Sequence, residues 1–293
     1  MATSVQESKL PLIVITGPTA SGKTGLAVRL AQRFGGEVIS ADSRAIYRGM
    51  NIGTAKPTVE ERCGVPHWGI DLVDPGKPFS ASAFKRYALQ KIDEIRSREK
   101  IPFLVGGTGL YVDAVVFDYE FGSAPNDSRR RELELMSLEG LHEYCFKNNI
   151  ALPENSKNRR YVIRAIERAG HEGRKRTSPI DNTVIVGITT SRETLRRRIA
   201  TRCEQIFEDG VVEEATILGK KYGWDNEAMT GNIYPLVRKY LSGELTHDGM
   251  VEKFTTLDWR LAKRQMTWLR RNPYIEWYEL GDAETYLSNI LAS

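Results

Sequence analysis

The sequence is poor in cysteine and has no long apolar run. Its 293 residues include only Cys63, Cys145 and Cys203, which are far apart and form no CxxC pair or Cys/His cluster. These spacings argue against a disulfide framework and a zinc site, so we expect a reduced, cytoplasmic location. No apolar stretch approaches the roughly 18 residues of a membrane span. The first ten residues lack the basic and apolar segments of a signal peptide.

The chain also has little excess charge: 42 Lys and Arg against 38 Asp and Glu give a net charge of +4. This total does not by itself indicate a polyanionic partner, so the distribution has to decide. Three stretches concentrate the cations: 157–176 (eight basic, two acidic), 192–202 (five and one) and 253–272 (six and one). Each could be a solvated helix face. The last also contains aromatic side chains, which suit stacking on unpaired bases.

β-branched apolar runs alternate with amphipathic stretches along most of the chain. Buried strands are expected at 11–16, 37–40, 101–105 and 183–188, and helices at 26–34, 82–99 and from about 192. This alternation predicts an α/β fold with a parallel sheet flanked by helices. Residues 119–168 are charged and helical, which predicts a small helical insertion domain. It would separate a first part of the core, 1–118, from a second part with C-terminal helices, 169–293.

A phosphate-binding motif lies between the first expected strand and helix. It fits G-x-x-x-x-G-K-[ST] and consists of Gly17, Pro18, Thr19, Ala20, Ser21, Gly22, Lys23 and Thr24. Backbone N–H groups of such a loop and the following helix N-terminus bind phosphate oxygens. Lys23 can reach the outer phosphates, and Thr24 can ligate Mg²⁺. The motif predicts a P-loop NTPase-like core with a phosphate-bearing ligand, without specifying ATP.

The sequence lacks the acidic strand end that ATPases and kinases use to hold Mg²⁺. The strand at 101–105 runs into glycines, and the strand at 183–188 runs into threonines, which weakens nucleotide hydrolysis as the function. Asp42 is the earliest acid at a strand end, where it could be a metal ligand, a general base or a turn residue. The loop 106–111 is likewise either part of the site or a structural turn, and 47–57 is expected to be an ordered loop over the site.

Together these segments closely resemble the tRNA dimethylallyltransferases, also called tRNA isopentenyltransferases, from about residue 11 to residue 272. The matching segments are Gly17–Thr24, Asp42–Arg44, Tyr47–Met50, Ile52–Pro57, Gly106–Tyr111, Arg159–Arg160, Arg164–Glu167 and Leu261–Arg270. The family transfers a dimethylallyl group from dimethylallyl diphosphate to N6 of an adenine, usually position 37, next to the tRNA anticodon. The resemblance implies Mg²⁺ as cofactor, the anticodon stem-loop and dimethylallyl diphosphate as partners, no membrane and a monomer.

The resemblance also implies roles for individual residues. Asp42 matches the general base that accepts the N6 proton, and Thr108 matches a residue that holds the substrates. Lys23, Thr24 and Mg²⁺ would stabilise the leaving diphosphate. Residues 17–24 would bind that diphosphate together with Arg202. The implied tRNA contacts are Asp42, Ser43, Arg44, Ala45, Arg159, Arg160, Lys263, Arg264 and Trp268, and the target adenine would have to leave its stack.

Two departures from the family pattern keep alternatives open. Ala45 stands where the family usually has Gln, and Asn232–Pro235 replaces a Gly-Tyr-Arg/Lys-Gln segment. One alternative is an adenylate dimethylallyltransferase that prenylates AMP, ADP or ATP. The other is a non-catalytic P-loop protein that binds RNA. The cation-rich stretches favour tRNA, and the intact Asp42, Lys23 and Thr24 favour catalysis.

Overall fold

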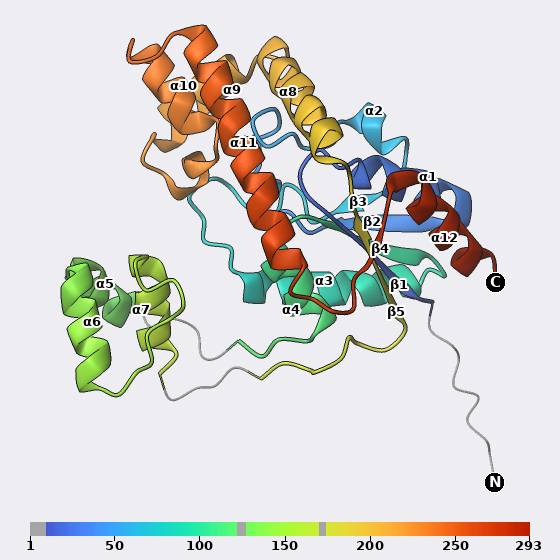
Figure 1. Cartoon of the computed structure of the whole chain (residues 1–293), viewed down its shortest axis with the longest axis horizontal. Helices are drawn as coiled ribbons and strands as arrows, with labels where there is room; N and C mark the ends of the chain where they lie inside the picture. Colours follow the sequence, from blue (N-terminus) through green and yellow to red (C-terminus); the bar gives the residue numbers. More distant parts are fainter. Residues whose placement is uncertain (1–9, 122–126, 170–173) are drawn as a thin grey trace. The chain divides into compact units, whose positions relative to one another are not determined.

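The structure is a computed structural model, and it describes residues 10–121, 127–169 and 174–293. In these ranges the strands form one parallel six-stranded sheet in the order β3-β2-β4-β1-β5-β6 (Figure 1). The strands are β1 Leu12–Thr16, β2 Gly36–Ser40, β3 His67–Trp68, β4 Ile101–Gly106, β5 Thr183–Ile188 and β6 Glu276–Tyr278. The predicted parallel α/β sheet is confirmed. The short edge strands β3 and β6 were not expected, because two or three residues carry no readable periodicity.

The central strand β1 explains why the site lies where it does. Ile13 of β1 pairs with Phe103 of β4 on one side and with Val184 of β5 on the other. Leu12 to Ile15 are fully buried, as expected for a parallel strand covered on both faces. The chain leaves β1 toward β2, which lies beyond β4, and returns from β4 to β5 beyond β1. Such a crossing point opens a crevice at the carboxyl ends of the strands.

Helices cover both faces of the sheet. On one face, α1 (Lys23–Phe34) and α12 (Leu280–Ala292) pack Leu26 and Leu287 against Ile13 and Ile15 of β1. On the other face lie α3 (Ala81–Arg96) and α4 (Gly109–Val116), joined by a stacked pair of rings, Phe84 and Tyr111. The short helix α2 (Val59–Arg62) follows the loop after β2. No helix in the described ranges is both long and apolar enough to cross a bilayer.

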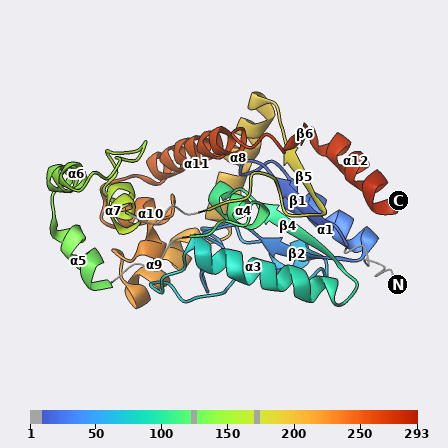
Figure 2. The ribbon, with the colours of Figure 1, turned by 90° about the horizontal axis from the view of Figure 1, so that it is seen from below.

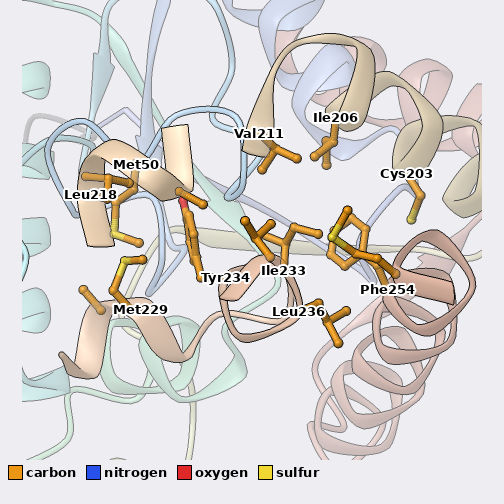
Figure 3. Packing of buried hydrophobic residues seen from close by; sticks show 14 of the residues in the cluster. Met50, Cys203, Ile206, Val211, Leu218, Met229, Ile233, Tyr234, Leu236 and Phe254 are labelled. Carbon is orange, nitrogen blue, oxygen red and sulfur yellow. The ribbon is translucent and has the colours of Figure 1, made fainter. Parts of the chain in front are cut away.

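The helices between β5 and β6 form a second layer with its own core. They are α8 (Arg192–Glu208), α9 (Val211–Tyr222), the 3-10 helix η1 (Glu227–Thr230), α10 (Tyr234–Leu241) and α11 (His247–Leu269). Figure 2 shows α11, the longest of them, running past α8 toward α4. Figure 3 shows the cluster that they share with the loop after β2, in which Met50, Ile233 and Tyr234 are completely buried.

A second compact unit, Tyr119–Thr177, separates from the rest of the chain. It holds α5 (Asp127–Leu135), α6 (Leu138–Lys147) and α7 (Arg159–Glu167) around Leu133, Leu141, Cys145, Val162, Ile163 and Ile166. The sequence-based boundary was 168, whereas this unit extends to Thr177. A backbone hydrogen bond from Glu120 N–H to the Arg174 carbonyl (2.7 Å) joins its two ends, and such a pairing leaves no trace in hydrophobic periodicity.

Candidate active site

The loop Gly17–Thr24 connects β1 to α1, and its residues Thr19, Lys23 and Thr24 line one wall of the site, whereas the other five predicted loop residues do not line it. Gly22 precedes α1 and has a left-handed backbone (φ 90°), and no side chain caps the helix. The first turn of α1 contains no acidic residue, so its N–H groups and the positive end of the helix dipole are available to an anion. Gln265 of α11 stabilises the loop, because its Oε1 accepts from Thr19 N–H at 2.7 Å.

Two hydrogen-bond donors at this loop are buried without a partner among the described residues: the Ser21 hydroxyl and Arg202 Nε. Arg202 lies on α8 and donates through Nη1 to the Thr19 hydroxyl. The neighbouring Arg198 donates to the Ser21 carbonyl at 3.2 Å. Buried polar groups are nearly always paired. Two unpaired donors beside a P-loop therefore indicate a place for an anionic acceptor.

Lys23 extends over the same loop. Its Nζ donates to the Pro18 carbonyl at 3.1 Å, and the side chain lines the cavity. Burial lowers the pKa of Lys23 to about 8, with the positive charge of Arg202 acting in the same direction and Asp42 opposing it. Lys23 is therefore largely protonated at neutral pH, and an incoming anion would increase that preference.

The opposite wall is built from loops that hold one another. Asp42 Oδ1 accepts from the N–H of Arg44 at 2.7 Å and of Ala45 at 3.4 Å, so Asp42 stabilises the turn after β2. Asp42 also lines the cavity. Thr108 Oγ1 accepts from Ser43 N–H at 3.1 Å. The loops after β2 and β4 are thus joined, and the candidates Asp42, Ser43 and Thr108 lie together.

A cavity of about 330 Å³ lies between these walls. Most of the predicted site residues line it, from the P-loop, the loops after β2 and β4, and helices α8 and α11: Thr19, Lys23, Thr24, Asp42, Ser43, Arg44, Ala45, Thr108, Arg202 and Arg264. The predicted loop over the site contributes Gly53, Thr54, Ala55 and Pro57. Residues far apart in the sequence therefore surround one space that can hold a small ligand.

The cavity also has lining residues that were not predicted. Asp258 of α11 is buried and accepts from Asn232 Nδ2 at 2.8 Å, and burial raises the pKa of its carboxyl. His67 of β3 bonds the Val65 carbonyl through Nδ1, while its Nε2 is buried without a partner in the described ranges. Gln265 lies within a matching motif but had no assigned role. Asp258 carries no local signal, because only the packing of α11 brings it to the cavity.

Trp268 has a visible structural role. Its indole N–H donates to Asp113 of α4 at 2.7 Å, and its ring lies so close to Gly109 that a Cβ there would be 2.0 Å from Trp268 Cδ1. This contact holds α11 against the start of α4, next to Thr108.

The other predicted RNA contacts lie outside the cavity wall. Lys263 is exposed on α11, with its ammonium 5.4 Å from the centre of the Trp259 ring. Arg159 and Arg160 begin α7 of the second unit, where Arg159 donates to the Glu134 carbonyl at 2.7 Å.

Two oxygen donors, one on each wall of the cavity, suit Mg²⁺. The Thr24 hydroxyl and the Asp42 carboxylate both line the cavity. Mg²⁺ usually keeps several waters and takes only one or two protein oxygens when it binds with a substrate phosphate. No group of three or more His, Cys, Asp or Glu in the described part of the chain could form an all-protein metal site. The donor set therefore fits a metal that arrives with a phosphate ligand.

Comparisons with known proteins agree with this arrangement. A family model described as IPP transferase matches residues 45–272, and one described as isopentenyl transferase matches residues 10–67. The chain is 40% identical to the tRNA dimethylallyltransferase of Shouchella clausii, over 94% of this chain and 93% of that protein. It is 39% identical to that of Pelotomaculum thermopropionicum, over 94% and 93%.

Solved structures show the same similarity. The tRNA isopentenylpyrophosphate transferase of Bacillus halodurans matches with a TM-score of 0.74 and 36% identity, over 97% of both chains. A eukaryotic dimethylallyltransferase acting on tRNA shares the fold, with a TM-score of 0.79 and 24% identity over 92% of this chain and 74% of that chain. These neighbours confirm the predicted P-loop NTPase-like fold. With a family model over most of the chain and relatives near 40% identity along nearly all of it, the chain belongs to the tRNA dimethylallyltransferase (IPP transferase) family and is a prenyltransferase.

Proposed function

We propose that this chain transfers a dimethylallyl group from dimethylallyl diphosphate to N6 of adenine 37, next to the anticodon of a tRNA. The observation that carries the proposal is the pair of buried donors without partners, Ser21 Oγ and Arg202 Nε, beside Lys23 and an uncapped helix N-terminus. All these groups favour an anion with several oxygens. Family relatives named tRNA dimethylallyltransferase supply the substrate class.

The diphosphate would lie on the P-loop wall. Loop N–H groups, Lys23 and Arg202 would hold its oxygens, and the Thr24 hydroxyl would hold Mg²⁺. Mg²⁺ would supply Lewis-acid stabilisation of the negative charge on the leaving diphosphate. Because these groups are already placed at the loop, they need little rearrangement as the charge develops.

The acceptor amine would lie against the opposite wall. N6 attacks the allylic carbon, the bond between that carbon and the diphosphate oxygen breaks, and the diphosphate departs with the electron pair. The proton from N6 goes to a carboxylate oxygen of Asp42. Hydrogen bonds from the Arg44 and Ala45 N–H groups hold Oδ1 of Asp42. Its second oxygen can therefore face the amine without loss of the turn.

The RNA itself would be bound by clustered Lys and Arg side chains, although the net charge of the whole chain is small. Arg264 lines the cavity and Lys263 is exposed one residue before it on α11. Arg44 and Ser43 line the same cavity, where they would contact the flipped adenosine. Arg159 and Arg160 on α7 are proposed as contacts with the anticodon stem.

The free cysteines support a reducing, cytoplasmic location. Cys145 and Cys203 are buried, and Cys63 is exposed. An exposed thiol and no disulfide among these residues suit a compartment in which thiols stay reduced.

One observation favours a second candidate, an adenylate dimethylallyltransferase. Ala45 is buried at the cavity wall, so no side-chain amide is available there to contact a nucleotide within RNA. The cations on α11 and α7 favour tRNA over this alternative.

One assay distinguishes the proposed tRNA reaction from the alternatives. Purified protein is incubated with labelled dimethylallyl diphosphate and Mg²⁺, with either an anticodon stem-loop that has adenines at positions 36 to 38 or AMP as acceptor. We expect label in the stem-loop only. Label only in AMP would establish the adenylate reaction instead, and no transfer to either acceptor would leave a non-catalytic RNA-binding protein.

A further inference from the structure

We propose that Glu214 is a positioning residue, which sets the wall of the diphosphate pocket by holding the loop Asn51–Gly53. This inference rests on the proposed function, because it concerns the donor side of that reaction. Glu214 lies on α9, is not part of any segment that the sequence analysis singled out, and does not line the cavity of the candidate site.

The contacts of Glu214 are unusually complete. One carboxylate oxygen accepts from Asn51 N–H at 2.8 Å and from Ile52 N–H at 2.7 Å. The other accepts from Gly53 N–H at 2.9 Å and from the Tyr234 hydroxyl at 3.0 Å. Three consecutive backbone N–H groups form a concave anion-binding nest. Here the anion is a side chain of the protein itself, so the nest determines the shape of this loop.

Tyr234 reaches Glu214 from the buried core. Figure 3 shows Tyr234 between Met50 and Ile233. Burial and the neighbouring Glu214 raise the pKa of Tyr234 far above its ordinary value, so the hydroxyl remains a donor. A Cβ on Gly53 would lie 2.7 Å from the Tyr234 ring and hydroxyl. Glycine at this position therefore allows the loop to rest directly on the tyrosine.

Lys56 restrains the chain just after the loop Asn51–Gly53. The buried ammonium of Lys56 donates to the Tyr47 carbonyl, to Asn51 Oδ1 and to Asp71 Oδ1, at 2.9, 2.9 and 2.6 Å. Glu214 and Lys56 thus restrain both ends of a segment with little regular structure. Between them, Gly53, Thr54 and Ala55 line the cavity together with Thr24 and Arg202.

The position of this segment therefore controls the space beside the P-loop. Thr24 and Arg202 would bind Mg²⁺ and the diphosphate, and a displacement of about 1 Å in a wall that positions substrate can cost about 100-fold in rate. Loss of the Glu214 carboxylate should release the three N–H groups, let the loop move and weaken binding of the diphosphate.

The test compares Glu214→Gln with two other variants. Glutamine keeps the size of the side chain but replaces one acceptor oxygen by an N–H₂ group, which cannot accept from N–H donors. Glu213→Gln is the matched control, since Glu213 is exposed on the same turn of α9. Tyr234→Phe removes one of the four hydrogen bonds and leaves the other three.

Two readouts are measured on the full chain, well below its thermal midpoint. The first is amide hydrogen exchange of the peptide covering residues 48–57. The second is the affinity for inorganic diphosphate with Mg²⁺, accompanied by kcat and KM for dimethylallyl diphosphate. For Glu214→Gln we expect faster exchange, about 10-fold weaker diphosphate binding and a KM raised by about as much. Tyr234→Phe should change both by about threefold, and Glu213→Gln should change neither.

The proposal is overturned if Glu214→Gln exchanges and binds diphosphate as the wild type does, or if only its thermal midpoint falls. It is also overturned if Glu213→Gln has the same effect, because the cause would then be the lost charge. Failure of the proposed function would look different. The wild type would transfer no dimethylallyl group, while the exchange and diphosphate arms would still report on the loop.

Discussion

The two walls of the cavity use their polar groups in opposite ways. Beside the P-loop wall, Ser21 Oγ and Arg202 Nε are buried donors with no partner in the described ranges, and Arg202 lines the cavity. On the opposite wall, Asp42, Ser43 and Thr108 are already joined to one another or to backbone N–H groups. An anion can satisfy unpaired donors, whereas paired groups keep a fixed shape. The first wall is thus suited to bind an anionic ligand, and the second to position an uncharged ligand such as an adenine ring.

The largest effect is expected at Asp42, which belongs to the paired wall yet would accept a proton. Asp42→Asn keeps Oδ1 and hence its hydrogen bonds to Arg44 and Ala45 N–H, but it removes the base. We expect kcat to fall by about 10²–10⁴-fold and RNA affinity to stay within about twofold. Single-turnover kinetics and filter binding measure the two quantities, with the exposed Asp93→Asn as control. Equal losses in both quantities would assign Asp42 to the shape of the wall alone.

Arg202 tests the unpaired wall. Arg202→Ala removes the donors that would hold the diphosphate, so kcat/KM for dimethylallyl diphosphate should fall by about 10²–10³-fold. RNA affinity should not change. Arg197, exposed on the same helix, provides the matched alanine control. If Arg202→Ala weakened RNA binding as much as it slowed transfer, the assignment of the P-loop wall to diphosphate alone would be wrong.

The pKa of Lys23 gives that wall a pH dependence. Lys23 is charged below its pKa of about 8 and loses its charge as the pH rises through that value. We expect kcat/KM for dimethylallyl diphosphate to fall about tenfold for each pH unit above the pKa. Bound diphosphate would raise the pKa, so kcat should respond less. Lys23→Arg should abolish the fall near pH 8, because guanidinium stays charged; a decline that persisted in this variant would implicate another group.

The smallest effect is expected at Arg264, where the cavity meets the cations of α11. Arg264→Ala should weaken stem-loop binding a few-fold and reduce the slope of log affinity against log salt by about 1. Arg260, exposed on the same helix and not at the cavity, is the comparison. If Arg260→Ala lowered the slope while Arg264→Ala did not, the RNA would lie on the other side of α11.

The parts that sequence analysis predicted share one physical property: they are local. Gly17–Thr24 follows a buried strand and leads into a helix, so neighbouring residues alone identify it as a phosphate-binding motif. Asp42 and Thr108 each follow a strand, and parallel strands bring their carboxyl ends to one edge of the sheet. The hydrophobic pattern also predicted the four longer strands, because each contains adjacent apolar residues, although β2 has only Val38 and Ile39 between polar neighbours.

The tertiary structure alone decided what surrounds these motifs. Glu214 meets Gly53 across 161 residues, and Arg202 meets Thr19 across 183. Such pairs depend on how α8 and α9 pack over the sheet, which no spacing in the chain records. Likewise Asp258 enters the cavity because Trp268 and Gln265 hold α11 against α4 and the P-loop. The sequence by itself determined where the phosphate-binding motif lies, between a buried strand and a helix; the packing of distant helices determined the shape of the space beside it.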